Sequence, residues 1–287
     1  MLRRDPGKDD PLGPAFRSLQ GEPGPARPGG RTAGGRPGGV RKVARSRIHV
    51  GTSGWTYDEW TGPFYPPEVT GAERLVFYAR TFDTVEVNST FYRLPFEGMI
   101  KGWNKRLPAG FHLVVKGSRR VTHLKKLVDC GEPLRAFLDR VLELRRLKVI
   151  LWQLPPSLHE DIPRLEDFLA SLPGGVRHAL EFRHKSWWEA KAAETLERFG
   201  AAFVTVSHPR LPGEVISTAD FLYLRFHGEG PRLYDYDYSR RELESWADRV
   251  RPHLKGRTLY AFFNNDVKCR APRNALLFRE ILTGGKG

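Results

Sequence analysis

Eight short strand-like segments alternate with helical segments along most of this chain, and this alternation restricts the possible folds more than any other feature. The strand-like segments are rich in β-branched and aromatic residues. We expect strands at residues 49–53, 84–88, 112–117, 149–154, 178–183, 202–207, 221–228 and 258–265. Such alternation predicts a parallel sheet with helical crossovers. Eight strands in about 240 residues fit a (β/α)8 barrel of the TIM type better than an open doubly wound sheet.

Apolar spacing and capping residues support helices between these strands. Pro163 stands at an early helical position, Ser186 and Ser239 can act as N-caps, and Glu242 lies at the capping-box offset from Ser239. We expect helices at residues 72–80, 97–106, 132–146, 163–172, 186–199, 239–254 and 274–282. The short gap between the sixth and seventh strands predicts no more than one turn, near Ala219. No GxGxxG motif follows the first strand, which disfavours a dinucleotide-binding fold.

Residues 1–47 differ sharply from the rest of the chain. They contain 11 Lys or Arg, 4 Asp or Glu, 10 Gly and 7 Pro, and thus carry half of the formal net charge of +14. Such a segment cannot bury enough apolar surface to offset its ordering entropy. We therefore expect a disordered basic leader at 1–47 and a barrel domain at 48–287. The leader could contact RNA, DNA or anionic lipid, but we favour a nonfunctional extension.

Cysteine usage and hydropathy bear on the compartment. Cys130 and Cys269 are the two cysteines of the chain and lack metal-type spacing, which suits a reducing compartment and argues against a disulfide scaffold. No apolar run is long enough to span a bilayer, and no secretory apolar core follows the basic N-terminus. We expect a cytoplasmic protein without a membrane partner, and the oligomeric state stays open.

Polar residues stand at the carboxyl end of every predicted strand, where a TIM-type barrel carries its chemistry. Period-two geometry places Glu86 and Asn88 on one face of their strand. The polar residues at the strand ends are Thr52, Ser53, Glu86, Asn88, Lys116, Gln153, Glu181, Arg183, Ser207, His208, Arg225, His227, Asn264, Asn265 and Asp266. A barrel core would have Val, Ile and Leu there, so the pattern predicts a functional site.

We assign the candidate catalytic roles to Glu86, Glu181, His227 and Lys116. Two carboxylates in one low-dielectric cavity can be driven to different pKa values, so Glu86 and Glu181 are candidate general acid and base. The alternative is that each is a structural ion pair, Glu86 with Lys116 and Glu181 with Arg183. His227 follows Arg225 by two residues on the same strand face and is a candidate proton shuttle, or else a structural hydrogen-bonding group.

The remaining candidates would bind substrate. Arginines at the site could hold a carboxylate or phosphate bidentately, and rings near it could stack on sugars or bases. The candidate substrate-binding residues are Thr52, Ser53, Trp55, Asn88, Tyr92, Gln153, Arg183, Trp187, Arg225, Asn264, Asn265 and Asp266. For the asparagines and aromatic residues, capping and packing are the alternatives. A metal is only weakly indicated because there is no HxH or HExxH motif, so any cofactor stays unknown.

Long motifs in the chain resemble those of the YecE-like domain-of-unknown-function family. They are GTSGWTYDEWTGPFYP (51–66), TVEVNSTFYRLP (84–95), VVKGSRRVTHLKKL (114–127), QLPPS (153–157), EFRHKSWW (181–188), LRFHG (224–228) and FFNND (262–266) followed by NA (274–275). The resemblance covers residues from His49 to the C-terminus and implies a TIM-type barrel, but no activity. It also implies a glycine near residues 268–270, where this chain has Cys269 or its neighbours.

Three functions fit these observations. The first is an enzyme, of hydrolase, isomerase or lyase type, that acts by glutamate acid–base chemistry on a small anionic or hydroxylated substrate resembling a phosphate or sugar. The second is nucleic-acid binding or processing by a barrel of the repair-endonuclease type, because the chain is basic and rich in loop aromatics. The third is a barrel that binds a ligand without catalysis.

Overall fold

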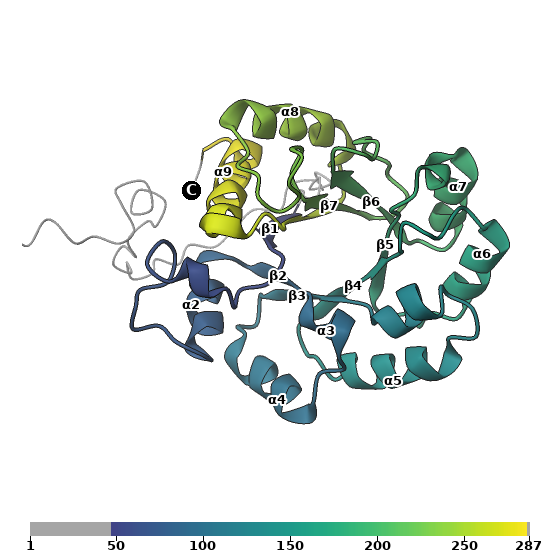
Figure 1. Ribbon diagram of the computed structural model, residues 1–287, viewed down its shortest axis with the longest axis horizontal. Helices are drawn as coiled ribbons and strands as arrows, with labels where there is room; N and C mark the ends of the chain where they lie inside the picture. Colours follow the sequence, from purple (N-terminus) through teal and green to yellow (C-terminus); the bar gives the residue numbers. More distant parts are fainter. Residues whose placement is uncertain (1–46, 286–287) are drawn as a thin grey trace, which may run out of the picture.

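Within residues 47–285, which this computed structural model describes, eight parallel strands form a nearly closed barrel surrounded by helices (Figure 1). The strands are β1 (Arg47–Thr52), β2 (Thr84–Val87), β3 (His112–Lys116), β4 (Leu147–Gln153), β5 (Arg177–Glu181), β6 (Ala202–Ser207), β7 (Phe221–Phe226) and β8 (Thr258–Phe263). Each overlaps one predicted segment, so the TIM-type barrel is confirmed. The predicted leader lies outside the described residues except for Arg47, which begins β1.

Helices lie outside the strands and cover their outer face (Figure 1). The α-helices of the described residues are α2 (Glu73–Thr81), α3 (Ser89–Tyr92), α4 (Glu97–Arg106), α5 (Gly131–Val141), α6 (Ile162–Ala170), α7 (Ala190–Arg198), α8 (Arg240–Val250) and α9 (Arg270–Thr283). The predicted cap of α8 is confirmed, because Ser239 and Glu242 form a complete capping box. No helix among the described residues is long and apolar enough to cross a membrane.

The helix predicted over residues 186–199 is wrong at its start. The structure has a 3-10 turn, η3 (Lys185–Trp188), and then α7, with Glu189 between them in an extended conformation (φ −91°, ψ 155°). Ser186 therefore does not cap α7. Its Oγ instead accepts a hydrogen bond from the backbone N–H of Glu160, at 2.8 Å. The short helix α3 was not predicted, because four residues are too few to show a helical period.

The barrel closes at a seam between β1 and β2. The hydrogen-bonded strand order is β1-β8-β7-β6-β5-β4-β3-β2. The two end strands, β1 and β2, therefore lie next to each other without a continuous ladder of hydrogen bonds. An isolated bridge between Ser53 and Glu86 joins them at the carboxyl end. A Cβ on Gly51 would lie 2.3 Å from the carbonyl oxygen of Thr84, so only glycine allows the two strands to approach this closely.

Two apolar clusters fill the molecule, one on each side of the sheet. The smaller one includes Val114, Leu151, Val204, Tyr223 and Phe262, which come from different strands and pack inside the barrel. The larger one packs the outer faces of the strands against the helices. Because side chains alternate along a strand, the charged residues that share the inner face with the smaller cluster point into the barrel as well.

Three rings, of His49, His112 and Tyr260, pack together at the amino end of the barrel. The rings of His49 and His112 lie 3.9 Å apart between centroids, and His112 Nδ1 is hydrogen bonded to the Tyr260 hydroxyl at 2.8 Å. His49 Nδ1 pairs with Asp83 at 2.7 Å. Access to the interior polar residues is therefore expected from the carboxyl end of the strands.

The connection from β8 to α9 contains two consecutive residues in the left-handed region, Lys268 (φ 58°) and Cys269 (φ 57°). This is the place where the family resemblance implied a glycine. A residue with a Cβ costs about 1–2 kcal/mol in this region. The turn therefore adopts a conformation that favours glycine, although neither Lys268 nor Cys269 is a glycine.

Replacing exposed Lys268 by glycine should therefore raise the free energy of unfolding by about 1 kcal/mol relative to Lys268→Ala. The alanine variant removes the same side chain but keeps the Cβ, so it is the matched control. Both variants keep the backbone N–H that donates to Glu59 at 3.0 Å. Urea denaturation measures the difference, and equal stabilities would show that the turn is not strained.

Candidate functional site

Three charged side chains from three strands meet inside the barrel. Arg225 on β7 donates from Nε and Nη2 to the two oxygens of Glu86 on β2, at 2.9 and 2.6 Å. Its Nη1 donates to Glu181 on β5, at 2.6 Å. All three side chains are 0–1% exposed. We call Glu86, Glu181 and Arg225 the buried ion network, and it ties the two halves of the barrel together.

The carboxylate of Glu86 is completely occupied by protein groups. Besides Arg225, it accepts hydrogen bonds from Ser53 Oγ and from the Tyr223 hydroxyl, each at 2.6 Å. The predicted pairing of Glu86 with Lys116 is therefore wrong, since the cation that reaches Glu86 comes from β7 across the barrel. Both oxygens of Glu86 are thus bonded to protein groups, and the side chain has no exposed surface.

Two arginines favour the ionised form of Glu181. Burial alone would raise its pKa, but the charges of Arg225 and Arg183 outweigh burial and hold the pKa of Glu181 well below its usual range. The predicted pairing with Arg183 is present, from Nη1 at 2.7 Å, and Gln153 donates to the same oxygen at 2.9 Å. In this state Glu181 has no proton to give.

His227 is held as a neutral imidazole. Burial and the charge of Arg225 lower the pKa of His227 to about 3. Its Nε2 lies 3.3 Å from Glu181 Oε1, and its Nδ1 lies 3.2 Å from the side-chain amide of Asn264. A neutral ring that donates from Nε2 to Glu181 and accepts at Nδ1 from Asn264 satisfies both contacts. His227 thus orients the network and does not change protonation near neutral pH.

Lys116 is the site residue whose pKa is shifted towards neutrality. It ends β3, and its ammonium lies 4.3 Å from the centre of the Phe91 ring contributed by α3. Burial and the charge of Arg225 lower the pKa of Lys116 to about 7. Among the described residues no carboxylate forms an ion pair with this amine, because Arg225 and Arg183 occupy the two glutamates.

Several other predicted residues lie at the mouth above the network. Gln153, Arg183 and Asn264 are partly exposed and bonded to Glu181 or His227. Asp266 is partly exposed as well, and burial raises its pKa. Tyr92 is 69% exposed and projects from the molecular surface.

Four predicted binding residues have structural contacts instead. Trp187 is fully buried, stacks on Phe182 and donates to the carbonyl of Leu158 at 2.8 Å, so it packs in the outer core. The remaining three form internal hydrogen bonds: Asn265 with Tyr236 and Asn274, Thr52 with Gly54 and Tyr78, and Ser53 with Glu86. Trp55 and Asn88 line a separate cavity, described below.

Tyr223 is a member of the site that sequence reasoning missed. It donates to Glu86, and burial together with the charge of Glu86 raises the pKa of Tyr223 well above its usual value. The signal was present in FLYLRFHG, because residues 223, 225 and 227 alternate and so share one face of β7. No three His, Cys, Asp or Glu side chains of residues 47–285 come together in a way that could hold a metal ion.

The comparisons with known proteins agree with the barrel fold. The profile of the family described as "Protein of unknown function DUF72" matches residues 49–286. The chain belongs to the DUF72 family. The resemblance to the YecE-like family is thereby confirmed, since the chain is 25% identical over 252 residues to the UPF0759 protein YecE of Escherichia coli (strain K12), covering 78% of this chain and 89% of that protein.

Two further comparisons extend the family match. The UPF0759 protein YunF of Bacillus subtilis (strain 168) is 23% identical over 270 residues, which cover 82% of this chain and 94% of that protein. The crystal structure of a DUF72 family protein from Thermotoga maritima matches with a TM-score of 0.75 and 34% identity, covering 83% of this chain and 99% of that chain. These similarities support the barrel fold and the family.

Proposed function

We propose that this DUF72 barrel is an enzyme that acts on a small anionic substrate at the carboxyl ends of its strands, with Lys116 as the reacting group. The observation that carries the proposal is the position of the Lys116 amine, which lies beside the Phe91 ring at the end of β3 with no carboxylate partner among the described residues. This environment lowers the pKa of Lys116 to about 7. A lysine with such a pKa is partly neutral at pH 7, so it can accept a proton or attack a carbonyl carbon.

The surrounding charges support this assignment. Hydrogen bonds from Arg225 hold both glutamates in fixed positions, so the buried ion network supplies an oriented field beside Lys116. Arg183 uses Nη1 for Glu181, while its other nitrogens make no hydrogen bond within residues 47–285. Its side chain is 14% exposed, so it can hold an anionic group close to Lys116. In this proposal Lys116, rather than Glu86 or Glu181, has the acid–base role.

Labelling with pyridoxal 5′-phosphate, an anionic aldehyde, tests the proposal without knowledge of the natural substrate. The neutral amine adds to the aldehyde carbon, water leaves, and borohydride reduces the imine to a stable adduct that peptide mass spectrometry locates. Lys116 should be modified fastest, with a pH profile whose midpoint is about 7.

Lys101 is the internal control for this labelling. It is exposed, and hydrogen bonding to Glu97 together with the charge of Glu97 raises the pKa of Lys101, so its modification should require a higher pH. Modification of Lys116 no faster than that of Lys101 would contradict the proposal.

Nucleic-acid binding is a second candidate, favoured by exposed rings beside the mouth. Tyr92 and Phe96 are 69% and 65% exposed, and exposed Arg93 lies between them in sequence. Phe91 contacts both Tyr92 and His123 edge-on, which brings the segments after β2 and β3 together. The second segment adds exposed Arg119 and Arg120 to the basic surface. Rings interspersed with cations suit stacked bases and phosphates.

A dT20 oligonucleotide should then bind the chain that lacks residues 1–46, and the affinity should fall with rising salt. Tyr92→Ala together with Phe96→Ala should weaken binding by at least about tenfold, because each base–ring stack contributes about 1–3 kcal/mol. Fluorescence anisotropy measures both effects. Binding that disappears when residues 1–46 are removed would assign the interaction to the basic leader and reject this candidate.

A further inference from the structure

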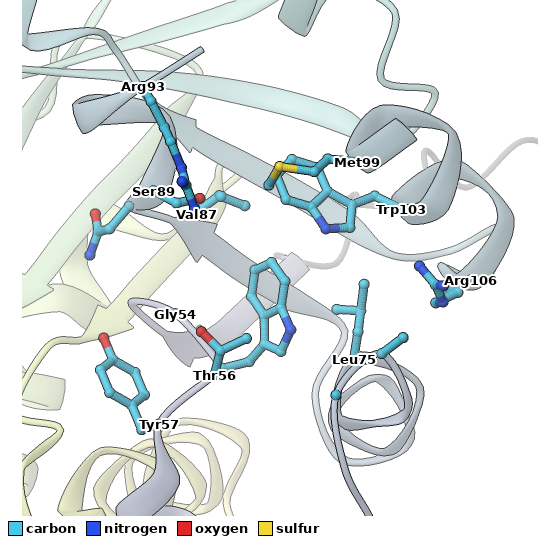
Figure 2. Close-up of a pocket in the computed structure, with 14 residues that line it drawn as sticks. Gly54, Thr56, Tyr57, Leu75, Val87, Ser89, Arg93, Met99, Trp103 and Arg106 are labelled. Carbon is cyan, nitrogen blue, oxygen red and sulfur yellow. The ribbon is translucent and has the colours of Figure 1, made fainter. Parts of the chain in front are cut away.

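A cavity of about 410 Å³ lies beside the buried ion network, above the seam between β1 and β2 (Figure 2). Its walls come from the segments after β1 and β2 and from α2 and α4, and they include Gly54, Leu75, Val87 and Trp103. None of the three network residues lines it. The cavity has a structural origin, because β1 and β2 lack a continuous ladder and the segments that follow them diverge.

One part of the wall is apolar and aromatic. Trp55 and Trp103 are 8% and 6% exposed, and their rings meet edge to face at 5.9 Å between centroids. Met99 and Leu75 complete this surface, and Figure 2 shows Met99 next to Trp103. Two indoles with a thioether form a surface that suits a planar apolar ring.

Polar groups at the same cavity lack partners. The side-chain oxygen of Asn88 is buried and accepts no hydrogen bond. Such an atom costs free energy unless a ligand or water donates to it. Figure 2 shows Arg93 and Arg106 at opposite ends of the wall that Met99 and Trp103 form. Neither arginine is paired with a carboxylate of residues 47–285, which leaves two cations facing a space without an anion.

We propose that this cavity binds an aromatic acid that carries a ring N–H or O–H. The ring packs against Trp55 and Trp103, the ring donor bonds to Asn88 Oδ1, and the acid group meets Arg93, one of the two arginines. The volume of about 410 Å³ lies within the range of small-molecule pockets. Lys116 does not line this cavity, so ligand binding there can be tested separately from the proposed enzymatic activity.

Isothermal titration calorimetry with three probes tests the ligand class on the full chain. Indole-3-acetate offers a ring, an N–H and a carboxylate, and it should bind with a Kd below about 1 mM. Indole lacks the acid and 1-naphthaleneacetate lacks the N–H, so each should bind at least about fivefold more weakly. Equal binding of indole and indole-3-acetate would overturn the role of the arginines, and no binding of any probe would overturn the site.

Two variants locate the binding. Ala72→Phe inserts a ring from the cavity rim at the start of α2 and should abolish binding, while circular dichroism checks that the barrel is folded. Arg93→Gln changes an exposed side chain and should weaken indole-3-acetate binding at least about fivefold without affecting indole. Arg80→Gln, on the same helix as Leu75 but outside the cavity, is the matched control and should change nothing. Unaltered binding in Ala72→Phe and Arg93→Gln would place the ligand elsewhere and reject the proposal.

Discussion

Arg225→Met should lower the free energy of unfolding by about 3–5 kcal/mol, the usual cost of removing one partner from a buried ion pair. The substitution keeps an unbranched side chain but leaves Glu86 and Glu181 fully buried and facing each other without the cation that both of them bind. Glu86 would also lose two of its four hydrogen bonds. Urea denaturation at pH 7 measures the loss.

The matched control is Arg240→Met. Arg240 pairs with Glu280 on the surface, where both side chains are at least 33% exposed, so its loss should cost less than about 1 kcal/mol. The double variant Glu86→Gln with Arg225→Met should be more stable than the sum of the single effects predicts, because removing the facing charge relieves part of the penalty. A loss in Arg225→Met no greater than in Arg240→Met would show that the network does not stabilise the barrel.

Lys116→Met should have the opposite effect on stability and a large effect on chemistry. Methionine fills the same space beside Phe91 without the cost of partly burying an ammonium, so the variant should gain about 1–3 kcal/mol at pH 7. The same variant should lose the fast pyridoxal 5′-phosphate adduct completely, because the reacting nitrogen is gone. A variant that is both destabilised and still labelled at the normal rate would remove Lys116 from the proposed mechanism.

The stability difference should also depend on pH in a defined direction. The folded pKa of about 7 lies below the unfolded value of 10.5, so between these values the unfolded chain binds more protons at Lys116 than the folded chain does. The contribution of Lys116 to the free energy of unfolding therefore rises with pH through this window. The advantage of Lys116→Met should shrink from pH 7 towards pH 10.5, and Lys101→Met, at an exposed site, should not show this trend.

The sequence predicted the fold well because local patterns encode it. Every strand except β5 contains β-branched or aromatic residues, and Ser239 with Glu242 marks the start of α8 directly. The start of α7 was missed because Ser186 has the chemistry of an N-cap, while its side chain is used by the neighbouring backbone of Glu160. Capping residues identify candidate helix ends, but tertiary contacts decide which of them are used.

The composition of the site and the pairing of Glu181 with Arg183 were predictable, but the partner of Glu86 was not. Strand ends placed Glu86, Glu181 and Arg225 in one region, but the partner of Glu86 depends on the tilt and stagger of strands far apart in the chain. Burial also affects the pKa values of Lys116 and His227 to different extents. Lys116 and His227 were both expected to react, and only the three-dimensional charge distribution separates a lysine with a pKa of about 7 from a histidine with a pKa of about 3.

The buried ion network also limits how this barrel can be divided. Glu86 belongs to the half that ends with β4, while Glu181 and Arg225 belong to the half that begins with β5. An amino-terminal fragment would enclose a carboxylate without its cation, so it should not fold by itself. The two fragments made by a break between β4 and β5 should instead assemble only with each other, as a split protein. Their association would depend on Arg225 of one fragment binding Glu86 of the other.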